Sequence, residues 1–151
     1  MNPLVLDLVP WIQQGFCCSQ LLVQLMLCTM NTESPDALLA ARGLCHGIGF
    51  ADGPCGLLTG GAMALSLAAG ASGDALVNPL LADYALWFES EVEQYGGIRC
   101  GQIALGLGSA GVSQNEINPA LCGDLLALCW EKILSLLEEY QVDYTGKGLT
   151  S

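Results

Sequence analysis

The sequence has few positively charged residues, and this shortage excludes several classes of partner. Only 4 Lys and Arg residues stand against 15 Asp and Glu residues, which gives an acidic protein with a formal net charge of −11. Nucleic-acid binding depends on clustered Lys and Arg that displace counterions, so we exclude nucleic acid as a partner. The same shortage disfavours attraction to an anionic membrane surface.

Long runs without any charge are present, and the mean hydropathy is +0.49, so membrane insertion has to be considered. Residues 8–32 and 53–73 contain no charged side chain, and each run is long enough to span a bilayer. Glutamines and Pro10 interrupt the first run, and glycines interrupt the second. Neither run is flanked by the Lys or Arg that would anchor a span, so we predict buried core helices and no membrane segment.

The start of the chain also lacks the features of a secretory signal. Residues 1–14 contain no Lys or Arg and include Asp7, whereas a signal needs a basic start followed by a long apolar run. We therefore expect a cytoplasmic protein. There the 8 cysteines should stay reduced, so a disulfide framework is disfavoured and metal binding or redox chemistry is favoured.

The hydrophobic pattern predicts an all-α fold, because no segment alternates apolar and polar residues long enough for a sheet. We expect a single-domain bundle of about six to seven helices over residues 1–151, loosely ordered after about residue 143. Ser34 followed by Pro35 is a typical helix start. Gly60 and Gly61 would allow two helices to approach closely. The expected helices cover residues 4–14, 16–30, 35 to the stretch 43–49, 54–70, 74–96, 100 to about 106, and 118–142.

Four of the cysteines share one local context, because a turn signal precedes each of them by two to four residues. They are Cys18 after Gly15, Cys55 after Asp52-Gly53-Pro54, Cys100 after Gly96-Gly97, and Cys122 after Asn118-Pro119. Each thiol should lie in the first turn of a helix, where unpaired N–H groups and the macrodipole favour an anion. We therefore expect these thiols to ionise more easily than usual, and thiolate is the form that binds metals or attacks disulfides.

The other cysteines, which are Cys17, Cys28, Cys45 and Cys129, lie in apolar runs or near a helix end. For these we favour packing as small hydrophobes, and the same role stays open for the first four. There is no CxxC spacing, so neither a zinc ribbon nor a thioredoxin motif can be assigned. His46 is the only histidine and stands beside Cys45, so we count His46 and Cys17 as second-tier metal ligands.

Several segments together carry a family resemblance. The run from Gly15 to Gln20 has the form G-x-x-C-x-Q, the run from Cys55 to Gly60 has the form C-G-x-x-x-G, and Cys100 and Cys122 follow singly. Over about residues 10–140 these segments resemble the C_GCAxxG_C_C family of redox-active proteins in order and spacing. Within that pattern, Ser19-Gln20 points to Cys18, rather than Cys17, as the first family cysteine. Leu57 departs from the pattern, which has a small residue there, and Asp52 stands in a stretch that is richer in glycine in the family.

The resemblance implies redox activity at the four cysteines, without a settled substrate or reaction. Related segments occur in multihaem proteins that carry an iron–sulfur centre, and many members belong to anaerobic prokaryotes. We expect an iron–sulfur cluster or zinc for electron transfer or redox sensing, with a protein as redox partner. The ligands in this prediction are Cys18, Cys55, Cys100 and Cys122. No CxxCH motif is present, so c-type haem is not expected.

Two alternatives stay open. In the first, the same four cysteines act without metal, and two of them form a reversible disulfide. In the second, the chain is a helical interaction module with inert buried cysteines. Any catalysis would be of the oxidoreductase type, and the apolar surplus is compatible with a homodimer.

Overall fold

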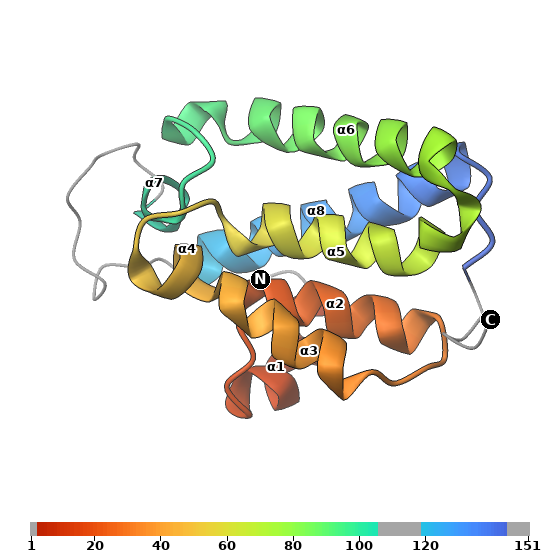
Figure 1. Ribbon diagram of the computed structural model, residues 1–151. Helices are drawn as coiled ribbons and strands as arrows, with labels where there is room; N and C mark the ends of the chain where they lie inside the picture. Colours follow the sequence, from red (N-terminus) through yellow and green to blue (C-terminus); the bar gives the residue numbers. More distant parts are fainter. Residues whose placement is uncertain (1–2, 106–118, 145–151) are drawn as a thin grey trace.

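The computed structural model describes residues 3–105 and 119–144, which fold into a helical bundle (Figure 1). Apart from one isolated bridge between Pro54 and Arg99, the residues in these two ranges form no β-structure, and the predicted all-α class is confirmed. Short 3-10 turns lie at Arg42–Leu44, Gly70–Ser72 and Glu93–Tyr95. The helices are α1 Pro3–Gln13, α2 Cys18–Thr29, α3 Pro35–Ala41, α4 Cys45–Phe50, α5 Gly56–Ala69, α6 Asp74–Glu91, α7 Cys100–Leu105 and α8 Pro119–Glu139.

The helix starts follow the predicted signals. The Ser34 hydroxyl accepts a hydrogen bond from the backbone N–H of Ala37 at 3.2 Å, and Pro35 takes the first position of α3. Pro119 begins α8 as expected, whereas the predicted cap residue Asn118 lies outside the described residues. The predicted tail beyond residue 144 and the glycine-rich residues 106–111 lie outside them too.

The segment labelled α4 differs from the other helices, because its backbone is left-handed. Five consecutive residues, from His46 to Phe50, have φ between 57° and 66°. This conformation crowds the β-carbon against the next carbonyl and costs roughly 1–2 kcal/mol for each non-glycine residue. The third helix therefore ends at Ala41 and does not continue into this stretch. With α4 set aside, the described chain has seven right-handed α-helices, in agreement with the predicted number.

The hydrophobic core lies among α2, α5, α6 and α8. In Figure 1, α6 lies above α5 and α8, and α2 with α3 lies below them. Gly60 and Gly61 of α5 do allow close approach, as predicted: a β-carbon at Gly61 would lie 2.2 Å from the Tyr84 hydroxyl oxygen. The fully buried side chains come from all four helices and include Leu22, Leu65, Leu80, Phe88 and Ile133.

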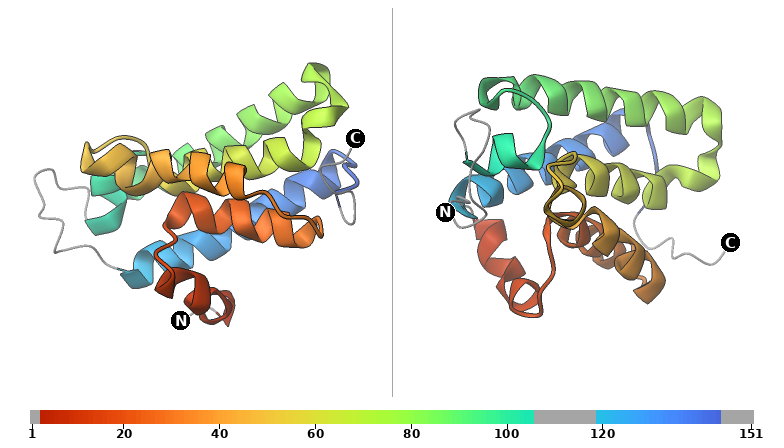
Figure 2. Two further views of the ribbon diagram at one scale, coloured as in Figure 1. Left: turned by 60° about the horizontal axis from the view of Figure 1, so that its bottom comes forward. Right: turned by 60° about the vertical axis from the view of Figure 1, so that its left-hand side comes forward.

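One end of the bundle collects several helix starts. The segments α4 and α7 lie there in Figure 1 and in both views of Figure 2, next to the first turns of α5 and α8. The outer helix α1 packs against α8 and α2. In residues 3–105 and 119–144, no helix combines the length and the apolar character that crossing a membrane requires.

Candidate cysteine site

The four cysteines singled out by their local context lie at helix starts, as predicted. Cys18 is the first residue of α2, and Cys100 is the first residue of α7. Cys55 is the residue directly before α5, and Cys122 lies in the first turn of α8. The Cys55 side chain is buried, and the other three are partly buried.

The structure brings these four thiols close enough for their charges to interact. Burial raises the pKa of Cys18 well above the ordinary thiol value, and repulsion by thiolates at Cys55, Cys122 and Cys100 raises it further. Burial also raises the pKa of Cys55 to about 12, against the opposing effect of a hydrogen bond from the backbone of Leu57. The pKa of Cys122 is raised to about 11, by burial and then by Cys100.

The expectation that these thiols ionise easily is therefore wrong. A helix start favours an anion, but burial removes the water that would stabilise a thiolate, and each thiolate repels the next. For Cys100 as well, the pKa is raised by burial first and by the nearby Asp52 carboxylate second. Without a positively charged partner, the four thiols remain protonated at neutral pH.

Backbone hydrogen bonds join the loops that precede Cys55 and Cys100. The Cys55 N–H donates to the carbonyl of Ile98 at 2.7 Å, and the Cys100 N–H donates to the carbonyl of Gly53 at 2.9 Å. Gly53 in turn donates its N–H to the carbonyl of Gly47 in α4 at 2.8 Å. Gly47 lies against Cys100, since a β-carbon at Gly47 would lie 2.7 Å from the Cys100 β-carbon. Three segments, those at Gly47 and Gly53 close together in the sequence and that at Cys100 far from both, thus form one frame around the site.

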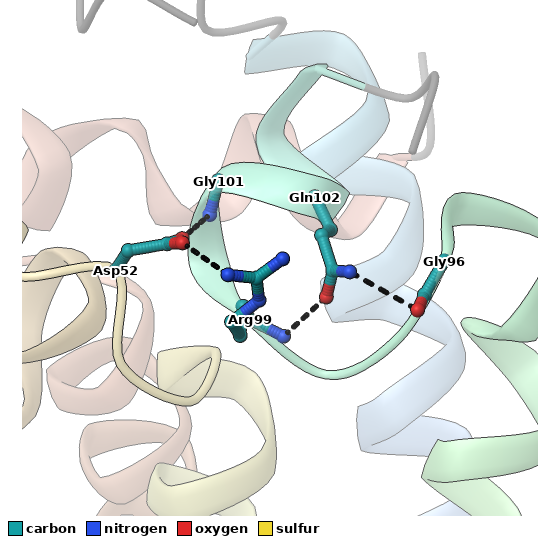
Figure 3. Close-up of polar contacts among 5 residues, drawn as sticks. All are labelled: Asp52, Gly96, Arg99, Gly101 and Gln102. Carbon is teal, nitrogen blue, oxygen red and sulfur yellow. Dashed lines mark hydrogen bonds and ion pairs between the residues drawn. The ribbon is translucent and has the colours of Figure 1, made fainter. Parts of the chain in front are cut away.

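Asp52 joins two of these segments (Figure 3). One carboxylate oxygen accepts the N–H of Gly101 at 3.0 Å, and the other pairs with the Arg99 guanidinium at 2.9 Å. The Gln102 side chain holds the same turn, because it accepts the Arg99 N–H at 3.2 Å and donates to the Gly96 carbonyl at 3.0 Å. Asp52 is a departure from the glycine-rich family pattern, and its carboxylate binds the backbone directly after Cys100.

Cys18 reaches the same region through the packing of α2 against α5. A β-carbon at Gly56 would lie 3.2 Å from the Ser19 nitrogen and 3.5 Å from the Cys18 β-carbon. The start of α2 therefore lies directly beside the start of α5, which Cys55 precedes. This contact depends on glycine at a position next to the site.

A fifth thiol belongs to this neighbourhood, and the sequence analysis missed it. Cys129 of α8 is fully buried, and burial raises its pKa to about 12, against the opposing effect of the nearby Tyr84 hydroxyl and with further repulsion from Cys18 and Glu91. The Tyr84 hydroxyl donates to the carbonyl of Leu57 at 2.6 Å. Cys122 and Cys129 are two helical turns apart and share a face of α8, a spacing that could have identified Cys129 from the sequence.

Cys17 and Cys45 form a disulfide, with their α-carbons 5.6 Å apart. The expectation that all cysteines stay reduced is therefore wrong, because the end of the 3-10 turn brings Cys45 onto the start of α2. Cys17 is consequently not free to bind a metal, as the second-tier assignment required. His46, the other second-tier ligand, is exposed, and its ring stacks on Phe50 with centroids 4.3 Å apart.

The described residues, which include all four candidate ligands, contain no group of three His, Cys, Asp or Glu side chains arranged to hold a metal ion. Four thiols are nevertheless a suitable donor set for soft metals such as iron in clusters and zinc. The residues fit such a group by their chemistry, and their raised pKa values show that a thiolate there needs a positive charge nearby.

Comparison with known proteins gives a family and no individual relative. Neither the search of curated proteins nor the search of solved structures found a match. Residues 16–136 match the family described as "Putative redox-active protein (C_GCAxxG_C_C)". The matched range contains Cys18, Cys55, Cys100 and Cys122 and covers most of the chain. The chain therefore belongs to the C_GCAxxG_C_C family of redox-active proteins.

Proposed function

We propose that this protein binds an iron–sulfur cluster through the thiolates of Cys18, Cys55, Cys100 and Cys122 and uses it for electron transfer or redox sensing. The observation that carries the proposal is that thiols from four different elements interact electrostatically at one end of the bundle. Such a centre supplies reversible one-electron chemistry when it is bound. A protein would serve as its redox partner, since three of the four thiols, those of Cys18, Cys100 and Cys122, are partly exposed.

The ionisation of the thiols supports a cluster over bare thiol chemistry at these four positions. Reactive cysteines have a lowered pKa and lie in electropositive surroundings. Here burial and mutual repulsion raise the pKa of each thiol, and a carboxylate, Asp52, lies beside Cys100. Binding to iron would offset both effects, because a metal-bound thiol loses its proton outright.

The arrangement of the thiols favours a cluster over a single zinc ion. With Zn–S bonds near 2.3 Å, a tetrahedral site holds its sulfurs roughly 3.8 Å apart. A cluster spreads its ligands over several iron atoms and therefore accepts thiols that are further apart. The described residues contain no group arranged to hold a metal ion, whereas the four thiols are close enough for their charges to interact, and we therefore propose a cluster.

The chain's own residues would hold the ligands in position. The paired loops around Gly53 and Arg99 orient Cys55 and Cys100, and Asp52 ties the first turn of α7 to the loop before α5. Buried apolar side chains such as Leu57 and Ile103 keep water from the inner side of the site. Exclusion of water and hydrogen bonds around the sulfurs are the means by which a protein sets the potential of such a centre.

Anaerobic purification tests the proposal. We expect a brown protein that contains iron and acid-labile sulfide in near-equal amounts and loses its visible absorption when reduced. Replacing any one of the four ligands by Ser should lower the iron content strongly. The matched control is Cys28→Ser, because Cys28 is an exposed free cysteine on α2. A colourless protein without iron after anaerobic preparation and reconstitution would contradict the proposal.

A further inference from the structure

We propose that the Cys17–Cys45 disulfide is a thiol–disulfide exchange site that accepts electrons from a dithiol reductant. This pair is separate from the four thiols discussed above, and the proposal does not depend on a cluster. The pair links the residue before α2 to the first residue of α4. It therefore lies between two segments that both contact the cysteine site.

The first observation is the polar lining of the disulfide. Ser19 and Gln20 are the buried polar side chains of the described chain, and both lie at this bond. The Ser19 hydroxyl oxygen is 3.1 Å from the Cys17 sulfur and 3.9 Å from the Cys45 sulfur. The Gln20 side-chain oxygen is 3.8 Å from the Cys45 sulfur. Gln20 also binds the backbone on both sides of the bond, because its side-chain oxygen accepts the Cys17 N–H at 3.2 Å and its amide group donates to the carbonyl of Leu38 at 3.0 Å.

The same groups provide partners for the reduced pair. After reduction, the Cys45 S–H can donate to the Gln20 side-chain oxygen, which lies within reach of a sulfur hydrogen bond. The Cys17 S–H can donate to the Ser19 hydroxyl oxygen, which keeps its own hydrogen bond to the carbonyl of Ala41 at 2.9 Å. The S–H groups of the reduced pair thus find hydrogen-bond acceptors among side chains that are already in place.

The second observation is the unequal exposure of the two sulfur-bearing residues. Cys17 is 8% exposed, whereas Cys45 is partly exposed and is followed by the exposed His46. An incoming thiolate can therefore reach Cys45 more easily than Cys17. Exchange rates depend on which sulfur is accessible, so Cys45 is the point of attack.

The reaction balances as a two-electron exchange. A thiolate of the reductant attacks the Cys45 sulfur, a new S–S bond forms, and the Cys17–Cys45 bond breaks with Cys17 leaving as thiolate. The second thiol of the reductant then attacks the mixed disulfide and releases Cys45 as a thiolate. The reductant ends as a disulfide, and its two thiol protons pass to Cys17 and Cys45, so that both become thiols.

Reduction has a structural consequence close to the four thiols. The bond tethers α2 to the left-handed segment α4, whose conformation is unfavourable at His46 and Ile48. Gly47 of the same segment lies against Cys100. Breaking the bond removes the covalent tether. The contact between Gly47 and Cys100 is then supported by the backbone hydrogen bond between Gly53 and Gly47.

Differential alkylation of the native, full-length protein in dithiothreitol redox buffers tests the proposal. Peptide mass spectrometry would follow Cys17 and Cys45, with the exposed Cys28 as the reference thiol. We expect the pair to pass fully and reversibly between disulfide and dithiol while the helical circular dichroism is retained. A pair that stays oxidised at every dithiol concentration until denaturant is added would overturn the proposal.

The direction of attack has its own test in two variants that each lack one cysteine of the pair and are treated with glutathione disulfide. We expect mixed disulfide to form on Cys45 in Cys17→Ser at least about tenfold faster than on Cys17 in Cys45→Ser, because access controls the rate. Equal or reversed rates would overturn the assignment of Cys45. Cys18→Ser separates the two proposals, because it should lose iron and keep the exchange.

Discussion

Gly60 of α5 and Ser19 of α2 are in direct backbone contact, so that a β-carbon at Gly60 would lie 2.5 Å from the Ser19 α-carbon. Cys18 is the first residue of α2, and Cys55 directly precedes α5. The contact between the two helices sets how closely their first turns approach. The relationship explains why a glycine is placed inside a helix, where it is otherwise unfavourable.

Gly60→Ala should destabilise the protein by about 1–3 kcal/mol, because the clash outweighs the roughly 1 kcal/mol that alanine contributes to helix stability. Chemical denaturation followed by circular dichroism measures the change. Gly70→Ala is the control, since Gly70 has helical backbone angles and no atom lies within 4 Å of a β-carbon there. Equal stability of the two variants would show that α2 and α5 can separate at no cost.

Tyr84→Phe should also lower the free energy of unfolding, by about 1–2 kcal/mol. The substitution leaves the carbonyl of Leu57 buried without the hydroxyl that now donates to it. Tyr140→Phe removes a hydrogen bond to Asp83 at the surface and should have a smaller effect. If the two variants lose equal stability, the buried hydrogen bond of Tyr84 contributes no more to stability than the surface hydrogen bond of Tyr140.

Asp52→Asn should speed alkylation of Cys100 in the metal-free protein and shift its pH profile toward lower pH. The Asp52 carboxylate raises the pKa of Cys100 by repelling the thiolate, and asparagine removes that charge. Asparagine tolerates the positive φ of 60° at this position, and the lost ion pair with Arg99 is half exposed, so stability should change by less than about 1 kcal/mol. Asp36→Asn, distant on α3, is the control. An unchanged alkylation profile in Asp52→Asn would contradict the electrostatic role.

The reduced, metal-free protein should lose stability as the pH rises above about 9. The pKa values of Cys55, Cys122 and Cys129 are raised from 9.0 to about 12, 11 and 12. Thiols of the unfolded chain therefore lose their protons first, and the stability present below pH 9 falls between about pH 9 and 12. Denaturation midpoints measured across this range check the prediction. A flat profile would mean that the three thiols are better solvated than their burial indicates.

The helices could largely be predicted from the sequence, because their starts and stops are local. Ser34 with Pro35 and the glycines near residue 73 determine boundaries within a few residues of the observed ones. The helix-start position of the four cysteines follows from the same local signals. Their ionisation could not be predicted, because it depends on burial and on thiols from distant segments.

The Cys17–Cys45 bond was beyond prediction for a related reason. The two residues are 28 positions apart, and their approach depends on how α3 packs on α2 and on where the 3-10 turn ends. Positive φ values at His46 and Ile48 are equally unexpected, because such residues rarely adopt them. A residue pattern read along the chain does not report which segments meet in space.

The position of Cys122 in α8 determines when the cysteine site can be completed. Cys18 and Cys55 leave the ribosome early, whereas Cys122 is synthesised near the end of the matched region. Until α8 packs against α5 and α2, the earlier thiols lack their last neighbour. Contacts of such long sequence separation are slow to form, because closing the intervening loop costs entropy. The four thiols can therefore come together only after Cys122 has been synthesised, and a cofactor that needs all four ligands cannot be fully bound before then.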